Sequence, residues 1–474
     1  MKKNFLTAAA FSVAAFFAAS TIAQAADVTF GGQIMTRYEV NEQSDFSAST
    51  DADDFIQSRV RLNADVNVND STSAFIQLHS ARTWGAAPSA GSVAGTQGSG
   101  NASFTPSDAD ASVGIHQAYF TLKNFATLPV DMKVGRQEII IDGHRLFGNT
   151  VWTVGQQTHD AVLLTHAHDN MSLVYAYITA IEDGAPTGTN LDDKNDVSVQ
   201  VANFNYQGVL GGAFTATYAY VNDGCGFQNG TQCDGTDNDI HNIGFRQAGQ
   251  LFGIDYRGEY NYQFGDGRGT ANSIGASSTA QFNNPGNTTF DAQGQDIDRS
   301  AYMFGVRVGK SFQNVTLKPK LTLWYDYLSG TSNEDQRSGN VGSFNTLFDT
   351  GHKYYGLMDN YLTVGAGSGT DGLGLQDIAI KTQISPMPGW TLKADYHWFY
   401  TAEGYAATSD GIGDNDNDLG NELDVTLVNK YNANTKILLG YSNYSATATY
   451  RNIKGLATGS DSADWAYVMI DVQF

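Results

Sequence analysis

Two arginines, Arg59 and Arg61, are spaced so that they could act together on an anion. They lie in SRVRLNADVNVND, residues 58–70. Polar residues alternate with apolar ones along this stretch: Arg59, Arg61, Asn63, Asp65 and Asn67 against Val60, Leu62, Ala64, Val66 and Val68. Because successive side chains of an extended chain point to opposite faces, both guanidinium groups share the polar face. What this face can do depends on whether it borders a protein core or water.

Two further arginines occupy the same kind of position. Arg37 lies on the polar face of residues 28–40, and Arg257 lies on the polar face of FGIDYRGEYNYQF, residues 252–264. In the second stretch the apolar face is largely aromatic, with Tyr256, Tyr260 and Tyr262. The pattern again predicts a strand with one polar and one apolar face.

The two cysteines suggest a different chemistry. Cys225 and Cys233 lie eight positions apart in CGFQNGTQC. In an oxidising compartment, this spacing favours a disulfide within one loop. Two isolated cysteines are a poor metal site, so we expect no metal there.

Other candidate sites are weak. THAHDN contains His166, His168 and Asp169, but the spacing departs from the His-x-His-x-Asp-His metal motif. DNDNDLG from Asp414 resembles the start of a calcium loop, but its glycine is one position late, and Val425 stands where a bidentate Glu is needed. No spacing singles out a Ser–His or Asp–His constellation, so we predict no enzyme, no cofactor and no resident metal. Weak binding of divalent cations by acidic loops stays open, as a bridge to lipopolysaccharide phosphates.

The elements that position these residues are strands, and the alternation recurs about eighteen times. The predicted spans are 27–40, 54–68, 72–84, 112–123, 131–141, 157–168, 170–181, 195–206, 211–222, 239–248, 251–264, 298–312, 315–328, 373–385, 390–401, 419–431, 434–446 and 464–474. Short connections follow the even strands and long ones follow the odd strands. This is the pattern of an antiparallel transmembrane β-barrel with short periplasmic turns and long extracellular loops.

Both ends of the chain agree with this fold class. Residues 1–25 combine Lys2 and Lys3, an apolar stretch and a small-x-small site at Ala23–Ala25, which is typical of a secretory signal peptide. The final strand, WAYVMIDVQF, ends on Phe474, as the strands read by barrel-assembly machinery do. We therefore expect one barrel domain, residues 26–474, in the outer membrane of a Gram-negative bacterium, in contact with its lipid and lipopolysaccharide.

The charge of the chain is unevenly placed. The net charge is −22, yet acids crowd the long connections while many lysines flank the short ones. Such acidity argues against nucleic-acid partners. In a barrel the apolar face of each strand meets lipid and the polar face meets a water-filled lumen, so we expect Arg37, Arg59, Arg61 and Arg257 to face the lumen. The alternatives are a soluble β-sandwich or a solenoid, although a solenoid should show a fixed repeat, and none is found.

Three stretches resemble the alginate-export family of outer-membrane porins. KVGRQEIIIDGHRLFGNTVWTVGQQTHDAVLL, residues 133–164, is similar to the family's Gly-Arg-Gln-Glu, Gly-x-x-Arg-Leu-x-Gly, Trp and closing Asp pattern. GSFNTLFDTGHKYYGLMD, residues 342–359, resembles its Phe-Asn-x-Leu-Phe-x-Thr-Gly-His loop, and residues 419–444 resemble its Gly-x-Glu-hydrophobic-Asp strand pair. The resemblance implies an eighteen-stranded barrel and an arginine-rich lumen that passes an anionic polysaccharide.

The resemblance also marks individual residues. It places Arg136 and Glu138 at the Gly-Arg-Gln-Glu positions, Arg145 at the Arg-Leu position and Asp160 at the closing acid, while His159 departs from the apolar residue usual before that acid. It implies that Arg136, Glu138 and Arg145 line the substrate path. However, Arg136 is in phase with Met132 and Val134, so a bulge at Gly135 is needed to turn it away from lipid.

These observations predict an outer-membrane channel for passive passage of small or oligomeric anionic solutes, including saccharides and organic acids. A dedicated exporter of an alginate-like anionic polysaccharide is the first alternative. A barrel that serves an adhesion or electron-conduit complex is the second, although the chain itself has no Cys-x-x-Cys-His haem motif.

Overall fold

The computed structural model describes residues 27–42, 52–84, 113–181, 197–223, 239–266, 298–338, 340–361, 369–370, 372–405, 416–454, 456 and 460–474. Within them lie nineteen strands: β1 (Asp27–Glu42), β2 (Asp53–Asn69), β3 (Thr72–Thr83), β4 (Gly114–Leu122), β5 (Asp131–Gln137), β6 (His159–His168), β7 (Met171–Ile181), β8 (Val197–Val209), β9 (Gly212–Asp223), β10 (Ile240–Leu251), β11 (Ile254–Asp266), β12 (Asp298–Ser311), β13 (Lys320–Leu328), β14 (Asn340–Val341), β15 (Leu375–Ile384), β16 (Trp390–Tyr405), β17 (Asp416–Lys430), β18 (Thr435–Ala446) and β19 (Ser462–Gln473). The helical segments are η3 (Phe125–Thr127), α2 (Asn333–Ser338), η6 (Gly351–Lys353) and α3 (Ala448–Ile453). None of the described helices is long and apolar enough to span a membrane.

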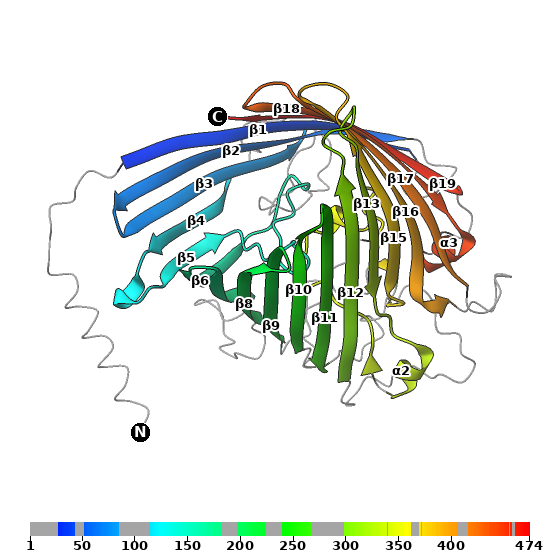
Figure 1. Cartoon of the computed structure of the whole chain (residues 1–474), viewed down its shortest axis with the longest axis horizontal. Helices are drawn as coiled ribbons and strands as arrows, with labels where there is room; N and C mark the ends of the chain where they lie inside the picture. The colour runs from blue at the N-terminus through cyan, green and yellow to red at the C-terminus, as the bar shows by residue number, and fades with distance from the viewer. Residues whose placement is uncertain are drawn as a thin grey trace.

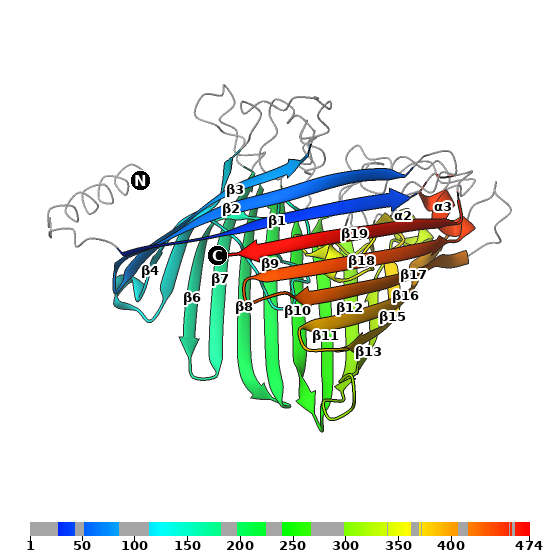
Figure 2. The ribbon, with the colours of Figure 1, turned by 90° about the horizontal axis from the view of Figure 1, so that it is seen from above.

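Eighteen of these strands form one closed antiparallel barrel. Each strand of the wall pairs with its neighbours along the chain, and β14 is a two-residue addition parallel to β12 (Figure 1). The barrel closes where β1 pairs with both β2 and β19, so that Ile34 lies opposite Val60 on one side and Val472 on the other (Figure 2). The predicted strand number and fold class are confirmed. Closure leaves no edge strand with unpaired backbone groups.

The alternation in the sequence becomes the two faces of the wall. On β2 the apolar Val60 and Leu62 are 45% and 47% exposed on the outside, whereas Arg59 and Arg61 are only 5% and 8% exposed on the inside. On β1 the outer Phe30 and Ile34 alternate with the inner Met35 and Arg37 in the same way. The period of two therefore sorts side chains between the lipid-facing surface and the lumen.

The short connections all join strand pairs at one end of the barrel. Four of them have only two residues; in the one between β10 and β11, Phe252 has φ 53° and Gly253 has φ 75°. Positive φ at both central positions gives the turn the twist that an antiparallel strand pair requires. Phe252 is 98% exposed at the tip of this turn.

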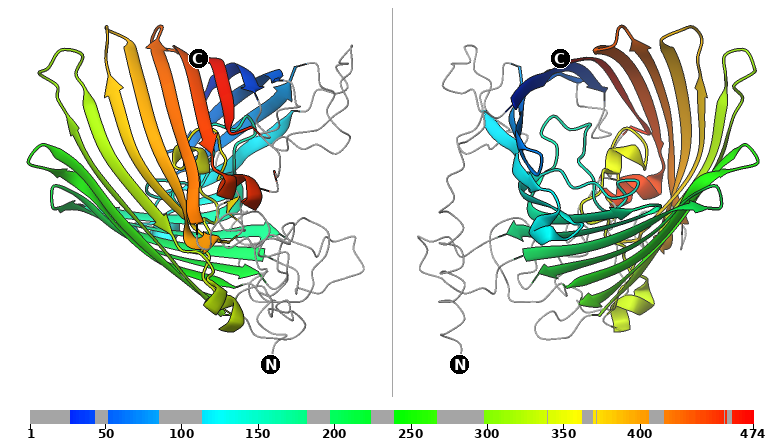
Figure 3. Two further views of the ribbon diagram at one scale, coloured as in Figure 1. Left: turned by 90° about the vertical axis from the view of Figure 1, so that its right-hand side faces the viewer. Right: turned by 60° about the vertical axis from the view of Figure 1, so that its left-hand side comes forward.

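Two long connections fold into the barrel instead of away from it. The first inward segment, residues 138–158, joins β5 to β6, and the second inward segment, residues 342–361, follows β14. Figure 3 shows both within the ring of strands. They supply much of the buried apolar core, including Ile139, Phe147, Phe344 and Tyr354. Several predicted boundaries move by a few residues: β5 ends at Gln137 instead of 141, because the chain turns inward there, β13 begins at Lys320 instead of 315, and β16 continues to Tyr405 instead of 401.

Candidate functional site

The two inward segments are joined to each other by backbone hydrogen bonds. Gly148 N donates to Phe348 O at 2.9 Å, and Phe348 N donates to Leu146 O at 2.9 Å. Gly148 lies so close to the second segment that a Cβ there would be 2.1 Å from Thr350 Oγ1. The segments therefore form one continuous structure across the lumen, and this close approach requires glycine.

Arg145 anchors the first inward segment to the wall. Its Nη2 lies 2.7 Å from Glu259 Oε1 on β11 and 2.7 Å from Asp326 Oδ2 on β13, and its guanidinium stacks 3.8 Å from the ring centre of Tyr354. Burial alone would lower the pKa of Arg145, but Asp326, Tyr355 and Glu259 raise it well above its usual value. This arginine is fully engaged with the protein.

Two further arginines surround the same acids. Arg257 Nη2 lies 3.7 Å from Glu259, and Arg307 Nη2 lies 3.3 Å from Asp326. Arg307 also lies 2.9 Å from the ring centre of Trp324. We call Arg145, Arg257, Arg307, Glu259 and Asp326 the acid-paired arginine cluster.

The third stretch that resembled the family meets the second inward segment. Glu422 on β17 accepts hydrogen bonds from Leu357 N at 2.6 Å and Met358 N at 2.9 Å. A Cβ at Gly356 would be 2.5 Å from both carboxylate oxygens of Glu422. All three stretches singled out in the sequence are thus in contact inside one barrel.

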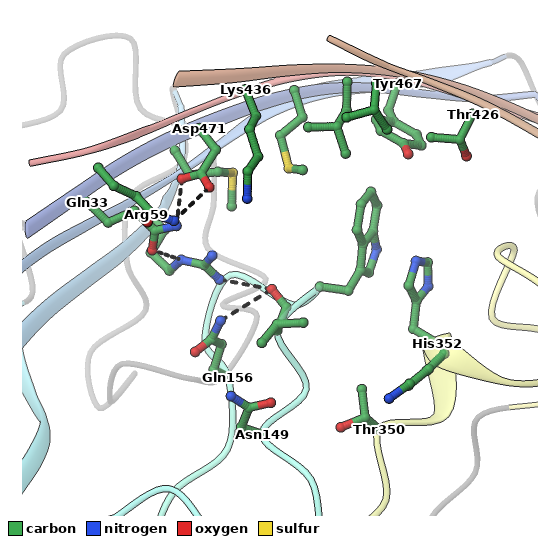
Figure 4. Close-up of a pocket in the computed structure, with 18 of the residues that line it drawn as sticks. Gln33, Arg59, Asn149, Gln156, Thr350, His352, Thr426, Lys436, Tyr467 and Asp471 are labelled. Atoms are coloured by element: carbon green, nitrogen blue, oxygen red, sulfur yellow. Dashed lines mark hydrogen bonds between the residues drawn. The ribbon is translucent and has the colours of Figure 1, made fainter. Parts of the chain in front are cut away.

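Beside the inward segments lies a cavity of about 980 Å³, bounded on its other side by the wall (Figure 4). The lining contains six cationic and four acidic side chains: Arg59, Arg61, Lys353, Lys381, Lys393 and Lys436, with Glu138, Asp395, Asp424 and Asp471. Phe474, the end of the chain, also borders it. The cavity is therefore richer in cationic side chains than the chain as a whole, whose net charge is −22.

Arg59 and Arg61 make mostly neutral contacts in this cavity. Arg59 Nε donates to Gln33 Oε1 at 3.1 Å (Figure 4). Its Nη1 donates to the carbonyls of Val151 and Thr153. Arg61 donates to Gln156 Oε1 at 2.5 Å and to His79 Nδ1 at 3.2 Å. We call Arg59 and Arg61 the neutral-partnered pair.

Asp471 of β19 lies near Arg59, since it accepts a hydrogen bond from Gln33, and the acid nearest to Arg61 is Glu138. Its carboxylate lies 4.0 Å from Arg61 and accepts hydrogen bonds from His116 and Asn149. Burial alone would raise the pKa of Glu138, but His116, Asn149 and Arg61 hold it below its usual value. Glu138 is thus an ionised acid shared among several donors, and it offsets only part of the arginine charge.

Arg37 is placed on the inner face but is not free. It pairs with Glu39 at 2.6 Å, donates to Trp152 O at 2.8 Å, and its guanidinium lies 3.8 Å from the ring centre of Trp152. His352 of the second segment stacks on the same indole at 4.4 Å. Trp152 therefore links both inward segments to β1. Sequence reasoning gave neither Trp152 nor His352 a role, although both lie within the stretches that resembled the family.

Arg136 lies on the outer face of the wall, which corrects the prediction that it lines the lumen. It forms a bidentate pair with Asp160, with distances of 2.9 and 2.6 Å, and the two side chains are 48% and 54% exposed. The predicted bulge at Gly135 is absent, because β5 keeps an unbroken register with β4 and β6. The register shift lies instead in β4, opposite Gln77 and Leu78 of β3.

The remaining predicted sites either lie outside the described residues or form no cluster that could bind a ligand. Cys225 and Cys233 lie outside the described residues, as does the start of the acidic stretch at Asp414. His168 lies 3.4 Å from Asp169 at an exposed turn. In the ranges that the structure describes, no group of three or more His, Cys, Asp or Glu side chains could hold a metal ion.

Comparison with known proteins gives one family and one fold. The sequence pattern of the family described as alginate export matches residues 26–463. No curated protein sequence matches the chain. Among solved structures, OccAB1 of Acinetobacter baumannii is similar at 14% identity and a TM-score of 0.56, over 94% of this chain and 96% of that one.

Two other solved barrels are similar to the same degree. OccK9 (OpdG) of Pseudomonas aeruginosa is 11% identical with a TM-score of 0.57, over 94% of this chain and 98% of that one. A BenF-like porin from Pseudomonas fluorescens Pf-5 is 11% identical with a TM-score of 0.53, over the same shares. At these identities the likeness shows the fold alone.

Proposed function

Since this chain belongs to the alginate export family and has the fold of outer-membrane porins, we propose that it is a passive outer-membrane channel for small or oligomeric anionic solutes. The family and the fold support a general channel role. The preference for anions rests on the neutral-partnered pair, Arg59 and Arg61, which lines the cavity between the wall and the inward segments.

The partners of these arginines carry the proposal. A guanidinium that donates to amide and carbonyl oxygens has no opposite charge beside it, whereas the field of one paired with a carboxylate is largely offset by that acid. Among the described residues, Arg59 donates to neutral groups, with Asp471 one hydrogen bond further away through Gln33. The acid nearest to Arg61 is 4.0 Å away and shared. Selectivity in a pore follows charges near its water-filled narrow section, and acids beyond a Debye length of about 10 Å are screened at 0.1 M salt.

The test is the reversal potential in a salt gradient across a planar bilayer. We expect anion selectivity for the wild type and a clear loss of it for Arg59→Ala combined with Arg61→Ala. Arg451→Ala is the matched control, because Arg451 pairs with Asp461 next to α3 and does not line the cavity. A cation-selective wild type, or a double variant with unchanged selectivity, would refute the proposal.

Export of an anionic polysaccharide is the alternative that family membership favours. An exporter should accept long chains end-on, so a purified polyuronate should block the conductance and oligomers of increasing length should dwell longer. A passive channel for small solutes should instead show liposome swelling that falls steeply with solute size. The two measurements on one preparation separate the alternatives.

We also propose that the barrel resides in the outer membrane of a Gram-negative bacterium, inserted by the barrel-assembly machinery through β19 and contacting lipid and lipopolysaccharide. A closed barrel keeps its backbone hydrogen bonds in detergent and migrates compactly until it is boiled. Identical mobility of boiled and unboiled samples, or recovery from the soluble periplasm, would contradict this placement.

A further inference from the structure

The outer face of the wall changes character at β5 and β6. On β1 the outward apolar residues run from Val28 to Tyr38, which is about 33 Å along a strand and about 25 Å across the membrane at a tilt of about 40°. On β5 the outward series is Met132, Val134 and then Arg136, so the apolar stretch from Met132 to Val134 is only about 7 Å along the strand and about 5 Å in height. The apolar band at this place is less than half of the height found at β1.

β6 repeats the same short series. Leu164 and Val162 lie opposite Met132 and Val134, and Asp160 lies opposite Arg136. The chain leaves the wall after Gln137 as the first inward segment, and it returns at His159, which lies opposite Gln137 and directly above Asp160. The two charged residues therefore flank this segment on both sides, at the point where the wall is lowest.

Arg136 and Asp160 neutralise each other, but both lie on the outer face of the barrel wall. Nε and Nη2 of Arg136 donate to the two carboxylate oxygens of Asp160. Nη1 has no such contact with this acid, and both side chains are about half exposed. A charged side chain at the midplane of a barrel's lipid face costs about 2–4 kcal/mol, and a bilayer avoids that cost by local thinning that brings water and headgroups to the charge.

From these observations we propose that β5 and β6 form a notch at which the leaflet on the side of the long connections is thinned, so that its headgroup zone reaches Arg136 and Asp160. The proposal rests on the membrane placement given under Proposed function. On β4, Ala118 lies opposite Arg136 and Ile115 nearer the strand's start is 53% exposed, whereas on β7 Thr179 lies opposite Asp160 and Tyr177 opposite Val162 is 42% exposed. The charged pair is therefore bordered by an apolar residue on β4 and by a neutral polar one on β7.

A second copy of the chain fits the notch less well than lipid does. Stable protein interfaces bury about 800 Å² on each partner, and the charged spot is only one residue pair wide. The pair also presents no unneutralised charge for a partner to complement. Headgroups and water can accept from Nη1, which makes no hydrogen bond within the described part of the chain, without matching any shape.

The first test compares stability in bilayers of different thickness. Wild type and Arg136→Leu combined with Asp160→Leu are folded into phosphatidylcholine vesicles with twelve-carbon or eighteen-carbon chains, and the urea midpoint is measured. We expect the leucine variant to have the lower midpoint in thin vesicles and the higher one in thick vesicles. The exchanged pair, Arg136→Asp with Asp160→Arg, should keep the wild-type order. A leucine variant destabilised equally in both would show that the pair only clamps the inward segment, and this would overturn the proposal.

The second test measures depth directly. A fluorophore is attached at Val162→Cys or, as the matched control on the tall wall, at Leu62→Cys, in a Cys225→Ser, Cys233→Ser background. Both outward positions lie at similar distances from the short-turn end of their strands. We expect shallow-brominated lipid to quench the label at 162 several-fold more than deep-brominated lipid, and the reverse at 62. Equal ratios at the two sites, or disulfide-linked copies through Val162→Cys, would overturn the thinning. Neither result depends on ion selectivity, so failure here is distinguishable from failure of the channel proposal.

Discussion

The lumen holds two groups of arginines that differ in what neutralises them. Arg145, Arg257 and Arg307 surround Glu259 and Asp326, at distances of 2.7 to 3.8 Å, and lie against aromatic rings. Arg59 and Arg61 donate mainly to amide, carbonyl and imidazole groups. The same residue type thus anchors the inward segments in one region and, in our proposal, leaves positive charge for solute in the other. Counting arginines in a lumen therefore says little until their partners are known.

Among the variants that test this contrast, Arg145→Ala should have the largest effect on stability and on single-channel conductance. Removing one partner of a buried ion pair costs about 3–5 kcal/mol, because Glu259 and Asp326 are left without it. The first inward segment loses its anchor, so we expect a lower urea midpoint and a larger, noisier single-channel conductance. Arg136→Ala on the outer face is the control for loss of an arginine, and it should leave the conductance unchanged. Quiet, wild-type conductance in Arg145→Ala would mean that the cluster does not hold the segment.

Gly148→Ala, at the junction between the two inward segments, should lower the stability by less than Arg145→Ala does. The new Cβ would lie 2.1 Å from Thr350 Oγ1 and 2.9 Å from His144 Cβ, so one segment must shift. Forcing extra atoms into a packed site costs about 1–3 kcal/mol. Gly258→Ala on β11 is the control, since nothing lies within 4 Å of its Cβ position. Equal urea midpoints for the two variants would count against a tight junction.

Gln156→Glu should give the neutral-partnered pair a carboxylate partner, as the acid-paired arginine cluster has. Gln156 Oε1 accepts from Arg61 Nη2 at 2.5 Å, so a carboxylate at that position would neutralise Arg61 without removing it. We expect the reversal potential to shift toward cations by less than in the Arg59→Ala, Arg61→Ala double variant, with no loss of stability. If Gln156→Glu left selectivity unchanged while the double variant abolished it, Arg59 alone would be the selective residue.

Asp349 should make the stability of the inward segments weakly dependent on pH. Burial raises the pKa of this carboxyl to about 7, against the pull of Arg145 and a hydrogen bond with Thr346. Because the folded-state pKa lies above the ordinary 3.8, the stabilisation is fully present below about pH 4 and is lost as the pH rises through 7. We expect the urea midpoint reported by tryptophan fluorescence to fall between pH 5 and pH 8 in the wild type. Asp349→Asn, which cannot ionise, should remove that part of the fall, and an identical pH profile would show that Asp349 is already ionised at pH 5.

The local alternation of polar and apolar residues was sufficient to predict the strands of the barrel wall. Alternation with a period of two is a property of each strand by itself, so strand number, the antiparallel order and the inner placement of Arg59 and Arg61 followed from residues 58–70 and their counterparts. The same reasoning was wrong at Arg136, where an expected bulge at Gly135 was invoked to avoid a charge on the outer face. The structure keeps the alternation and places the charge outside, paired with Asp160.

Tertiary structure alone decided which arginines have a carboxylate beside them that offsets their charge. Arg145 reaches Glu259 and Asp326 across 114 and 181 positions of sequence, and Tyr355 across 210, so no local pattern could reveal that it is neutralised. The inward path of residues 138–158 and 342–361 is likewise a long-range result. These stretches have no regular period, and their conformation comes from packing against each other and against Glu422. A period of two is read from neighbouring residues, whereas charge neutralisation depends on distances between strands that only the closed barrel brings together.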